Sequence, residues 1–406
     1  MTEFFKRQIR MITNGGLRVF RQKCAILLSM PPAFLIVIIV RLLRPIITMR
    51  FGFLASSRIG HFAAQTEHYL CKRDDDEYGK RTIDIFYLQS MYEVCNQQLK
   101  RMLGRHIHIF QYAHVLDKVN RFLPGGKLHT IELPTDRDIS GYCLRSPHLF
   151  FTKKETEIGE KKLRELGIPQ GVPFVCFHAR DSAYLDKIHP KLDSSYQDYK
   201  DVDVENYILT AEELVMRGYF VVRMGAAVNA PLRVKNPRII DYATKCRDDF
   251  LDIYLCANCR FFISSASGLV TVPWIFRKPI AWSNLAPLEY IPTWDSRGLL
   301  IAKKYRRKGE DRLLTFREVI DSGVGRFIMT EHFAEEGIEV VDNTPEEIAD
   351  MVREMDDRLN GRWRTTEEDE ELQRSFWSLF KPSYLNKLFL LRIGSEFLRQ
   401  NKELLG

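Results

Sequence analysis

The sequence predicts an α/β protein with two doubly wound, Rossmann-like domains that face each other across a cleft, preceded by a membrane-associated helical segment. The chain has 406 residues, enough for two domains of ordinary size with an appendage. Short apolar runs alternate with amphipathic stretches, which favours parallel sheets covered by helices. We therefore expect an N-terminal segment 1–45, domains at 46–152 and 153–345, and C-terminal helices at 346–406.

Composition is that of an ordinary folded protein, with 45% hydrophobic and 28% charged residues. The formal net charge of +7 favours anionic partners such as phosphates, nucleotides or anionic lipid. No block of like charge resembles a nucleic-acid arm, so nucleic acid is not an expected partner. The eight cysteines are scattered, and Cys256 and Cys259 lack a second ligand pair for zinc. We expect no metal site and interpret these two as buried packing residues.

The N-terminal segment combines a basic stretch with an apolar one. Residues 4–23 hold six basic residues and no acidic one, which suits an anionic membrane surface. Residues 24–40 carry no charge, and about 17 residues is the lower limit for a span. Pro31 and Pro32 interrupt this run, and basic residues flank both ends. We favour a helix that re-enters the cytoplasmic face of a bacterial inner membrane; a full span or a buried core helix are the alternatives.

Strands and helices alternate through the rest of the chain. In the first domain we expect strands at 47–55, 83–89 and 106–113 and helices at 63–74 and 92–103. In the second we expect strands at 172–179, 220–226, 238–243, 259–265, 278–283 and 299–302 and helices at 153–168, 203–219, 248–258, 269–276 and 346–360. The amphipathic stretch 389–405 is expected to pack back on the first domain.

Polar groups follow several predicted strands, and ligands of open α/β sheets bind at carboxyl strand ends. The run from Val172 to Phe177 ends in His178, Arg180 and Asp181. An arginine there offers the forked donors that suit a phosphate. The alternative is that Arg180 and Asp181 simply pair with neighbouring residues.

Two further strands end in candidate ligand-binding groups. Arg223 ends the run FVVR, and Gly225 follows, where a missing side chain lets a backbone approach a ligand. Asp241 and Tyr242 end the run RIID-Y, where a base or ribose would be held.

The run FFISSASGL predicts a strand, a small-residue turn and a helix start. Its residues Ser264, Ser265, Ser267 and Gly268 would form an anion seat at a helix N-terminus. The alternative is that Ser267 only caps the helix.

The loop SSRIGHF after the first strand carries Arg58, Gly60 and His61, and Glu67 lies on the following helix. We expect this loop to face the second domain. Histidine is the residue type that most often serves as a general base near neutral pH, so His61 is one candidate and Glu67 is a second. The alternative is that His61 only caps or packs the helix start.

Taken together, these residues resemble a GT-B glycosyltransferase. The HAR of residues 178–180 is similar to the HxRRxD motif of fucosyltransferase-like enzymes, although the second arginine is missing and Asp181 follows at once. The RIGHF loop, the VVRMGA and IIDYA strands and the FFISSASGL turn resemble uncharacterised bacterial glycosyltransferases encoded with surface-polysaccharide genes. The resemblance covers roughly residues 46–400.

The resemblance implies a sugar transfer from a nucleoside-diphosphate sugar to a surface-glycan acceptor. Arg180 and Arg223 would hold the donor diphosphate, and residues 264–268 would seat a phosphate or the nucleoside. The reaction would be inverting and would need neither a metal nor a resident cofactor. The membrane segment would bring the enzyme to a lipid-linked acceptor. Transfer of a pyruvyl or phosphoryl group, and a non-catalytic glycan- or nucleotide-binding role, are the competing interpretations.

Overall fold

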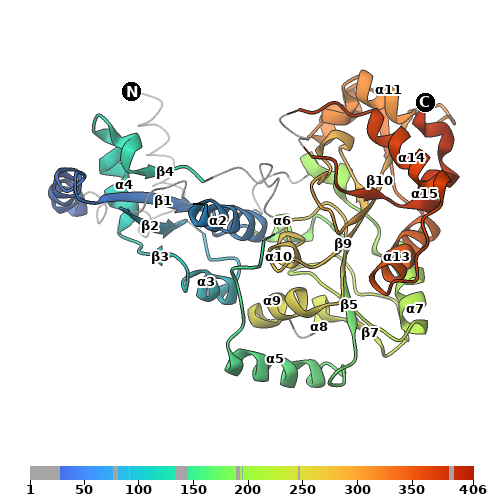
Figure 1. Cartoon of the computed structure of the whole chain (residues 1–406), viewed down its shortest axis with the longest axis horizontal. Coiled ribbons are helices and arrows are strands. Elements are labelled where there is room, and N and C mark those ends of the chain that lie inside the picture. Colours follow the sequence, from blue (N-terminus) through green and yellow to red (C-terminus); the bar gives the residue numbers. More distant parts are fainter. Residues whose placement is uncertain are drawn as a thin grey trace. The chain divides into compact units, whose positions relative to one another are not determined.

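The computed structural model describes residues 28–75, 81–90, 92–133, 145–188, 193, 195–245, 247–383 and 388–406. They form a mixed α/β fold with parallel sheets, divided into two compact units (Figure 1). The first unit comprises 1–58, 68–95 and 103–134, and the second comprises 59–67, 96–102 and 135–406. The division runs through helix α2 (Ile59–Asp74), whose first half belongs to the second unit.

The first unit is built on a parallel four-stranded sheet with the order β3-β2-β1-β4. Its strands are β1 (Thr48–Leu54), β2 (Thr82–Leu88), β3 (His108–Ile109) and β4 (Thr130–Ile131). The strand predicted over 106–113 shrinks to two residues, because Ala113 already begins helix α4 (Ala113–Phe122).

The predicted membrane segment is only partly within the described residues, and its basic part, 4–23, lies outside them. Residues 28–42 are helical, and no helix among the described residues is long and apolar enough to cross a membrane. Ala33, Val37 and Val40 are at most 5% exposed in the core of the first unit. The described helix therefore packs on the first unit along one stripe.

The second unit is built on a parallel seven-stranded sheet with the order β13-β10-β9-β8-β5-β6-β7. Its strands are β5 (Phe174–His178), β6 (Phe220–Arg223), β7 (Ile239–Asp241), β8 (Phe262–Ser264), β9 (Ile280–Leu285), β10 (Leu299–Ala302) and β13 (Arg392–Ile393). From β5 the chain adds strands in one direction to β7 and then crosses back to add β8, β9 and β10 in the other. The order therefore reverses between β5 and β8, where open α/β sheets form a ligand crevice.

Helices cover both faces of this sheet. Figure 1 shows α9 (Asp249–Asn258) and α10 (Thr271–Ile275) on one side, and α7 (Ile208–Met216) and α13 (Pro345–Leu359) on the other. The helix predicted over 203–219 begins with a 3-10 turn, Val204–Tyr207, before α7. Cys256 and Cys259 are fully buried at the end of α9, as expected for packing residues.

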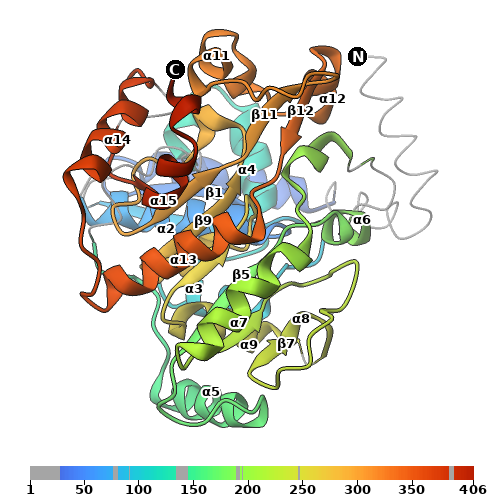
Figure 2. The ribbon, with the colours of Figure 1, turned by 90° about the vertical axis from the view of Figure 1, so that its right-hand side faces the viewer.

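The C-terminal helices belong to the second unit, which corrects the prediction that they pack on the first domain. β13 extends the second sheet beside β10, and α15 (Ser395–Gln400) packs against α13 and α14 (Glu367–Ser378) (Figure 2). A buried contact fixes this arrangement: Glu354 of α13 accepts hydrogen bonds from the backbone N–H and the hydroxyl of Ser395.

Candidate functional site

The ends of β5 and β8 meet at the point where the strand order reverses. His178 pairs in register with Ser264. Just beyond, the Ser265 backbone N–H donates to the His178 carbonyl over 3.3 Å, and the Arg180 N–H donates to Ser265 Oγ over 2.9 Å. Ser264 Oγ lies 3.4 Å from Ser267 Oγ. Two motifs about 85 residues apart in the sequence thus form one polar surface at the crevice.

Three buried basic side chains surround this surface. Arg180 follows β5 and is 8% exposed, Arg223 ends β6 and is 1% exposed, and Lys303 follows β10 and is 1% exposed. Burial lowers the pKa of both Arg180 and Lys303, since taking a cation out of water disfavours its charged form. The strand ends therefore concentrate positive charge in a poorly hydrated place.

Carboxylates partner these cations. Arg180 forms an ion pair with Asp201, and Lys303 donates to the Asp201 carbonyl over 2.8 Å and pairs with Asp342 over 2.7 Å. Arg223 lies 3.5 Å from Asp241 on the adjacent strand and donates to the Ala230 carbonyl over 2.7 Å.

His178 lies between the two arginines as a neutral imidazole. Burial, followed by the charges of Arg223 and Arg180, lowers its pKa to about 4. Its Nδ1 atom and the Nε of Arg223 are buried without a hydrogen-bond partner. Buried polar atoms are nearly always satisfied in folded proteins, so these two atoms mark a place where a bound polar ligand would complete the hydrogen bonding.

The start of α2 contacts the serine turn within the second unit. A Cβ built on Gly60 would lie 2.9 Å from Gly268 Cα and 3.1 Å from its carbonyl oxygen. Only glycine allows this approach, because real Cβ contacts are never so short. His61, next in sequence and partly buried, is thereby held beside the turn that follows β8. The structure thus brings together two of the predicted site segments, residues 60–61 and 264–268.

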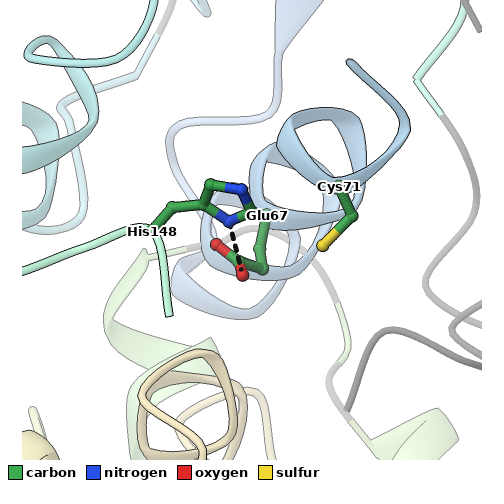
Figure 3. Close-up of side chains that lie close together, drawn as sticks. All are labelled: Glu67, Cys71 and His148. Atoms are coloured by element: carbon green, nitrogen blue, oxygen red, sulfur yellow. Dashed lines mark hydrogen bonds and ion pairs between the residues drawn. The ribbon is translucent and has the colours of Figure 1, made fainter. Parts of the chain in front are cut away.

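Glu67 lies elsewhere on α2 and is 1% exposed. It pairs with Arg277, and His148 Nδ1 lies 2.9 Å from its Oε1 atom. Figure 3 shows Glu67 and His148 turned toward each other, with Cys71 one turn further along the helix. Carboxylate, imidazole and thiol are all metal ligands. The guanidinium of Arg277 already contacts Oε1 of Glu67 and neutralises its charge. We therefore interpret this cluster as an ion pair.

Three of the predicted ligand-binding residues, Tyr242, Asp181 and Asp241, have hydrogen-bond or ion-pair partners within the protein, and Gly225 is closely packed. Tyr242 is fully buried and donates to Asp252 over 2.9 Å, which removes its hydroxyl from any ligand. Asp181 accepts from the backbone N–H groups of Ala183 and Asn229 and so joins two loops. A Cβ on Gly225 would lie 2.8 Å from Val228, so the loop's own packing requires this glycine. Asp241 neutralises Arg223 and accepts from Leu232 N–H.

A groove of about 430 Å³ lies along the edge strand β7. Its lining includes Leu166, Leu232, Asn236, Asp241 and Lys245. It is placed beside the outermost strand of the sheet rather than at the reversal of strand order. Arg180, Arg223, the unsatisfied imidazole and the serine turn lie at or next to that reversal, and Lys303 reaches Arg180's partner Asp201 from β10. The strand ends are therefore the better candidate site.

Sequence reasoning missed Lys303 and Asp201. The signal for Lys303 was present, because it follows the apolar run LLIA in the same way that Arg180 follows FVCFH. Asp201 lies after a 3-10 helix, Ser195–Lys200, in a stretch with no apolar periodicity, and its role emerges only from its contact with Arg180.

Comparisons with known proteins leave the family open. No family model matches the chain, and no curated protein matches it. Among solved structures, the chain is similar to the ADP-heptose LPS heptosyltransferase II of E. coli, with 12% identity over 76% of this chain and 98% of that one and a TM-score of 0.41. It is also similar to a family 9 glycosyl transferase from Veillonella parvula, with 10% identity over 63% and 85% and a TM-score of 0.42. At such TM-scores the similarity carries no functional argument, which rests instead on the geometry of the site.

Proposed function

We propose that this protein is a glycosyltransferase that moves a sugar from a nucleoside-diphosphate sugar to a surface-glycan acceptor. The observation that carries the proposal is the pair of buried arginines, Arg180 and Arg223, beside a neutral His178 where the strand order reverses. Lys303 reaches this group from β10 through its contact with Asp201, the partner of Arg180. Parallel α/β sheets bind phosphorylated ligands at this position. The resemblance of the HAR, RIGHF and FFISSASGL segments to glycosyltransferases supports the choice of a sugar as the transferred group.

The donor diphosphate would lie against Arg180, with Ser265 and Ser267 completing the seat. The Asp201 carboxylate pairs with the guanidinium of Arg180, and a phosphate oxygen would take over this contact. Charge-assisted contacts of this type are stronger than neutral hydrogen bonds and hold the diphosphate in one orientation. His178, neutral near pH 7, would supply the further hydrogen bond that its Nδ1 lacks.

The transfer itself would be a direct displacement at the anomeric carbon. His61 would accept the proton of the acceptor hydroxyl, whose oxygen forms the new bond to the anomeric carbon. The old bond to the diphosphate oxygen breaks, and its electron pair leaves with the diphosphate. Arg180, Arg223 and Lys303 would stabilise that developing charge, so the chemistry needs no resident cofactor. Glu67, held by Arg277, would fix the helix that carries His61.

Titration calorimetry of the full chain with UDP, GDP, CDP, dTDP and ADP tests the binding half of the proposal. One diphosphate should bind, and Arg180→Ala should weaken it about 30- to 160-fold, the effect of losing a charge-assisted contact of about 2–3 kcal/mol. Arg353→Ala is the matched control, because Arg353 pairs with Glu213 on the helical face of the same unit. Equal losses in both variants, or no binding by the native chain, would contradict the proposal.

The transfer half is tested with the sugar nucleotide of whichever diphosphate binds. Release of that diphosphate should require an acceptor glycan and should fall in His61→Ala without a loss of donor binding. Transfer of a phosphoryl group from a nucleoside triphosphate to the same acceptor would instead make the protein a phosphotransferase.

A further inference from the structure

The N-terminal helix, residues 28–42, is apolar all round but buried on one stripe only. Every residue from 33 to 40 is apolar, yet only Ala33, Val37 and Val40 of these are buried. Around them Leu35 is 65%, Ile39 56% and Leu42 74% exposed. A helix with apolar residues on every face is normally covered on every face, by protein or by lipid. The protein core covers one stripe of the helix. Nothing in the described part of the chain covers its other apolar faces.

The helix is fixed rigidly to the first unit. It runs parallel to α4: at one end the Tyr112 hydroxyl donates to the Ser29 carbonyl over 2.9 Å, and at the other end Arg41 donates to Asn120 and to the Pro124 carbonyl. Ala33, Val37 and Val40 share a core with side chains of α4 and of the strands. The exposed face is therefore a permanent feature of this unit's surface.

The apolar surface continues past the end of the helix. Ile46 is 69% exposed just after the helix. Phe122 at the end of α4 is 88% exposed, and Leu128 is 50% exposed. The hydrogen bond from Arg41 to Pro124 places this turn beside the helix end. Large exposed apolar patches on soluble proteins mark protein or membrane contact sites.

The chemistry of the face favours a lipid surface as its occupant. Residues 33–40 offer no hydrogen-bonding side chain, whereas protein interfaces rely on anchors such as tyrosine, tryptophan and arginine. Two exposed basic residues, Arg44 and Lys127, border the patch. Apolar side chains flanked by cations match an anionic bilayer, in which the apolar side chains enter the hydrocarbon and the cations meet the headgroups.

We infer that the first unit docks on an anionic membrane with this helix lying in the plane of the bilayer, its outer face in the hydrocarbon and its inner stripe on the protein. The described helix spans about 22 Å along its axis, at 1.5 Å per residue, which is less than the ~30 Å of a bilayer core. Such docking is monotopic, and it would hold the protein where lipid-linked acceptors are found. The inference stands apart from the proposed function, because vesicle binding needs no donor or acceptor.

Vesicle flotation of the full chain tests this docking. The native protein should float with vesicles of phosphatidylcholine and phosphatidylglycerol, and less with phosphatidylcholine alone. The double variant Leu35→Asn, Ile39→Asn should lose at least about tenfold in vesicle partitioning, since each change removes an inserted side chain without adding charge. Met216→Asn is the matched control, because Met216 is 79% exposed on α7 of the second unit. Arg44→Gln should reduce only the preference for anionic vesicles.

Sedimentation velocity without lipid tests the alternative that a second copy of the chain, and not a membrane, covers this face. The native protein and the double variant should both sediment as the same species. A native dimer that the double variant converts to monomer would make this face a subunit interface and overturn the inference. Unchanged flotation of a correctly folded double variant would overturn it as well. Diphosphate binding by calorimetry should be the same in all of these variants, so a failure here is distinct from a failure of the proposed function.

Discussion

Gly60 and Gly268 are in direct backbone contact, and the contact is asymmetric. A Cβ on Gly60 would lie 2.9 Å from Gly268 Cα, whereas a Cβ on Gly268 would lie no closer than 3.5 Å to Gly60 N. The first distance forces a backbone to move, and the second is an ordinary van der Waals contact. The contact is the structural reason that His61 lies next to the serine turn of the candidate site.

Gly60→Ala should therefore damage the site, and Gly268→Ala should be tolerated. Overpacking of this kind costs about 1–3 kcal/mol of the free energy of unfolding and displaces the neighbouring segment. We expect Gly60→Ala to lower kcat/KM at least about tenfold, because His61 moves with it, and Gly268→Ala to change it less than about threefold. Thermal unfolding and steady-state assays of both variants check this. Equal effects would show that the contact does not position the site.

Asp201→Asn should strengthen diphosphate binding. The Asp201 carboxylate is paired with Arg180, so an incoming phosphate must displace an anion and then lie close to it. Removing that charge should raise affinity about threefold to tenfold while lowering the free energy of unfolding, because the largely buried Arg180 loses its counter-charge. Calorimetry beside thermal unfolding measures both. Weaker binding would mean instead that Asp201 orients Arg180 for the ligand.

From the sequence, the polar residues at strand ends could be predicted, but the ion pairs and contacts that they form could not. His178, Arg180 and the serine turn could be found because polar residues directly follow apolar runs, a local pattern. That Arg223 and Asp241 neutralise each other depends on β6 lying beside β7, and periodicity does not reveal strand order. The apolar N-terminal run was predicted to be membrane-associated from its composition. Ala33, Val37 and Val40 pack on the protein. The sequence could not predict which side of the helix is buried, because every residue of the run is apolar.

Acid stability should report the neutral state of the His178 imidazole in the folded protein. Its folded pKa of about 4 is below the usual value of about 6.5, so between these values the unfolded chain binds a proton that the folded chain does not. Stability should fall as the pH is lowered from about 6.5 to about 4, with no contribution from His178 above that window. His178→Asn should reduce this fall by on the order of 2 kcal/mol in pH-dependent unfolding.

Asp295 provides a control of opposite sign. Burial raises its pKa to about 6, so the folded chain holds a proton that the unfolded chain releases between about 3.8 and 6. This term lowers stability as the pH rises through the same window, and Asp295→Asn should remove it. If both variants shift the pH profile in the same direction, the assignment of His178 as a neutral imidazole is wrong.

Glu67→Gln separates a structural from a catalytic role for this residue. Glu67 is 1% exposed and paired with Arg277, so the change leaves a buried guanidinium without its counter-charge. Losing one partner of a buried pair costs about 3–5 kcal/mol, and the melting temperature should drop accordingly. At a temperature where the variant remains folded, its pH–rate profile should keep the native shape, because the proposed base is His61. His61→Gln should instead leave the melting temperature nearly unchanged and abolish the rate. A folded Glu67→Gln variant that binds donor normally but has lost its turnover would show that Glu67, and not His61, acts as the general base.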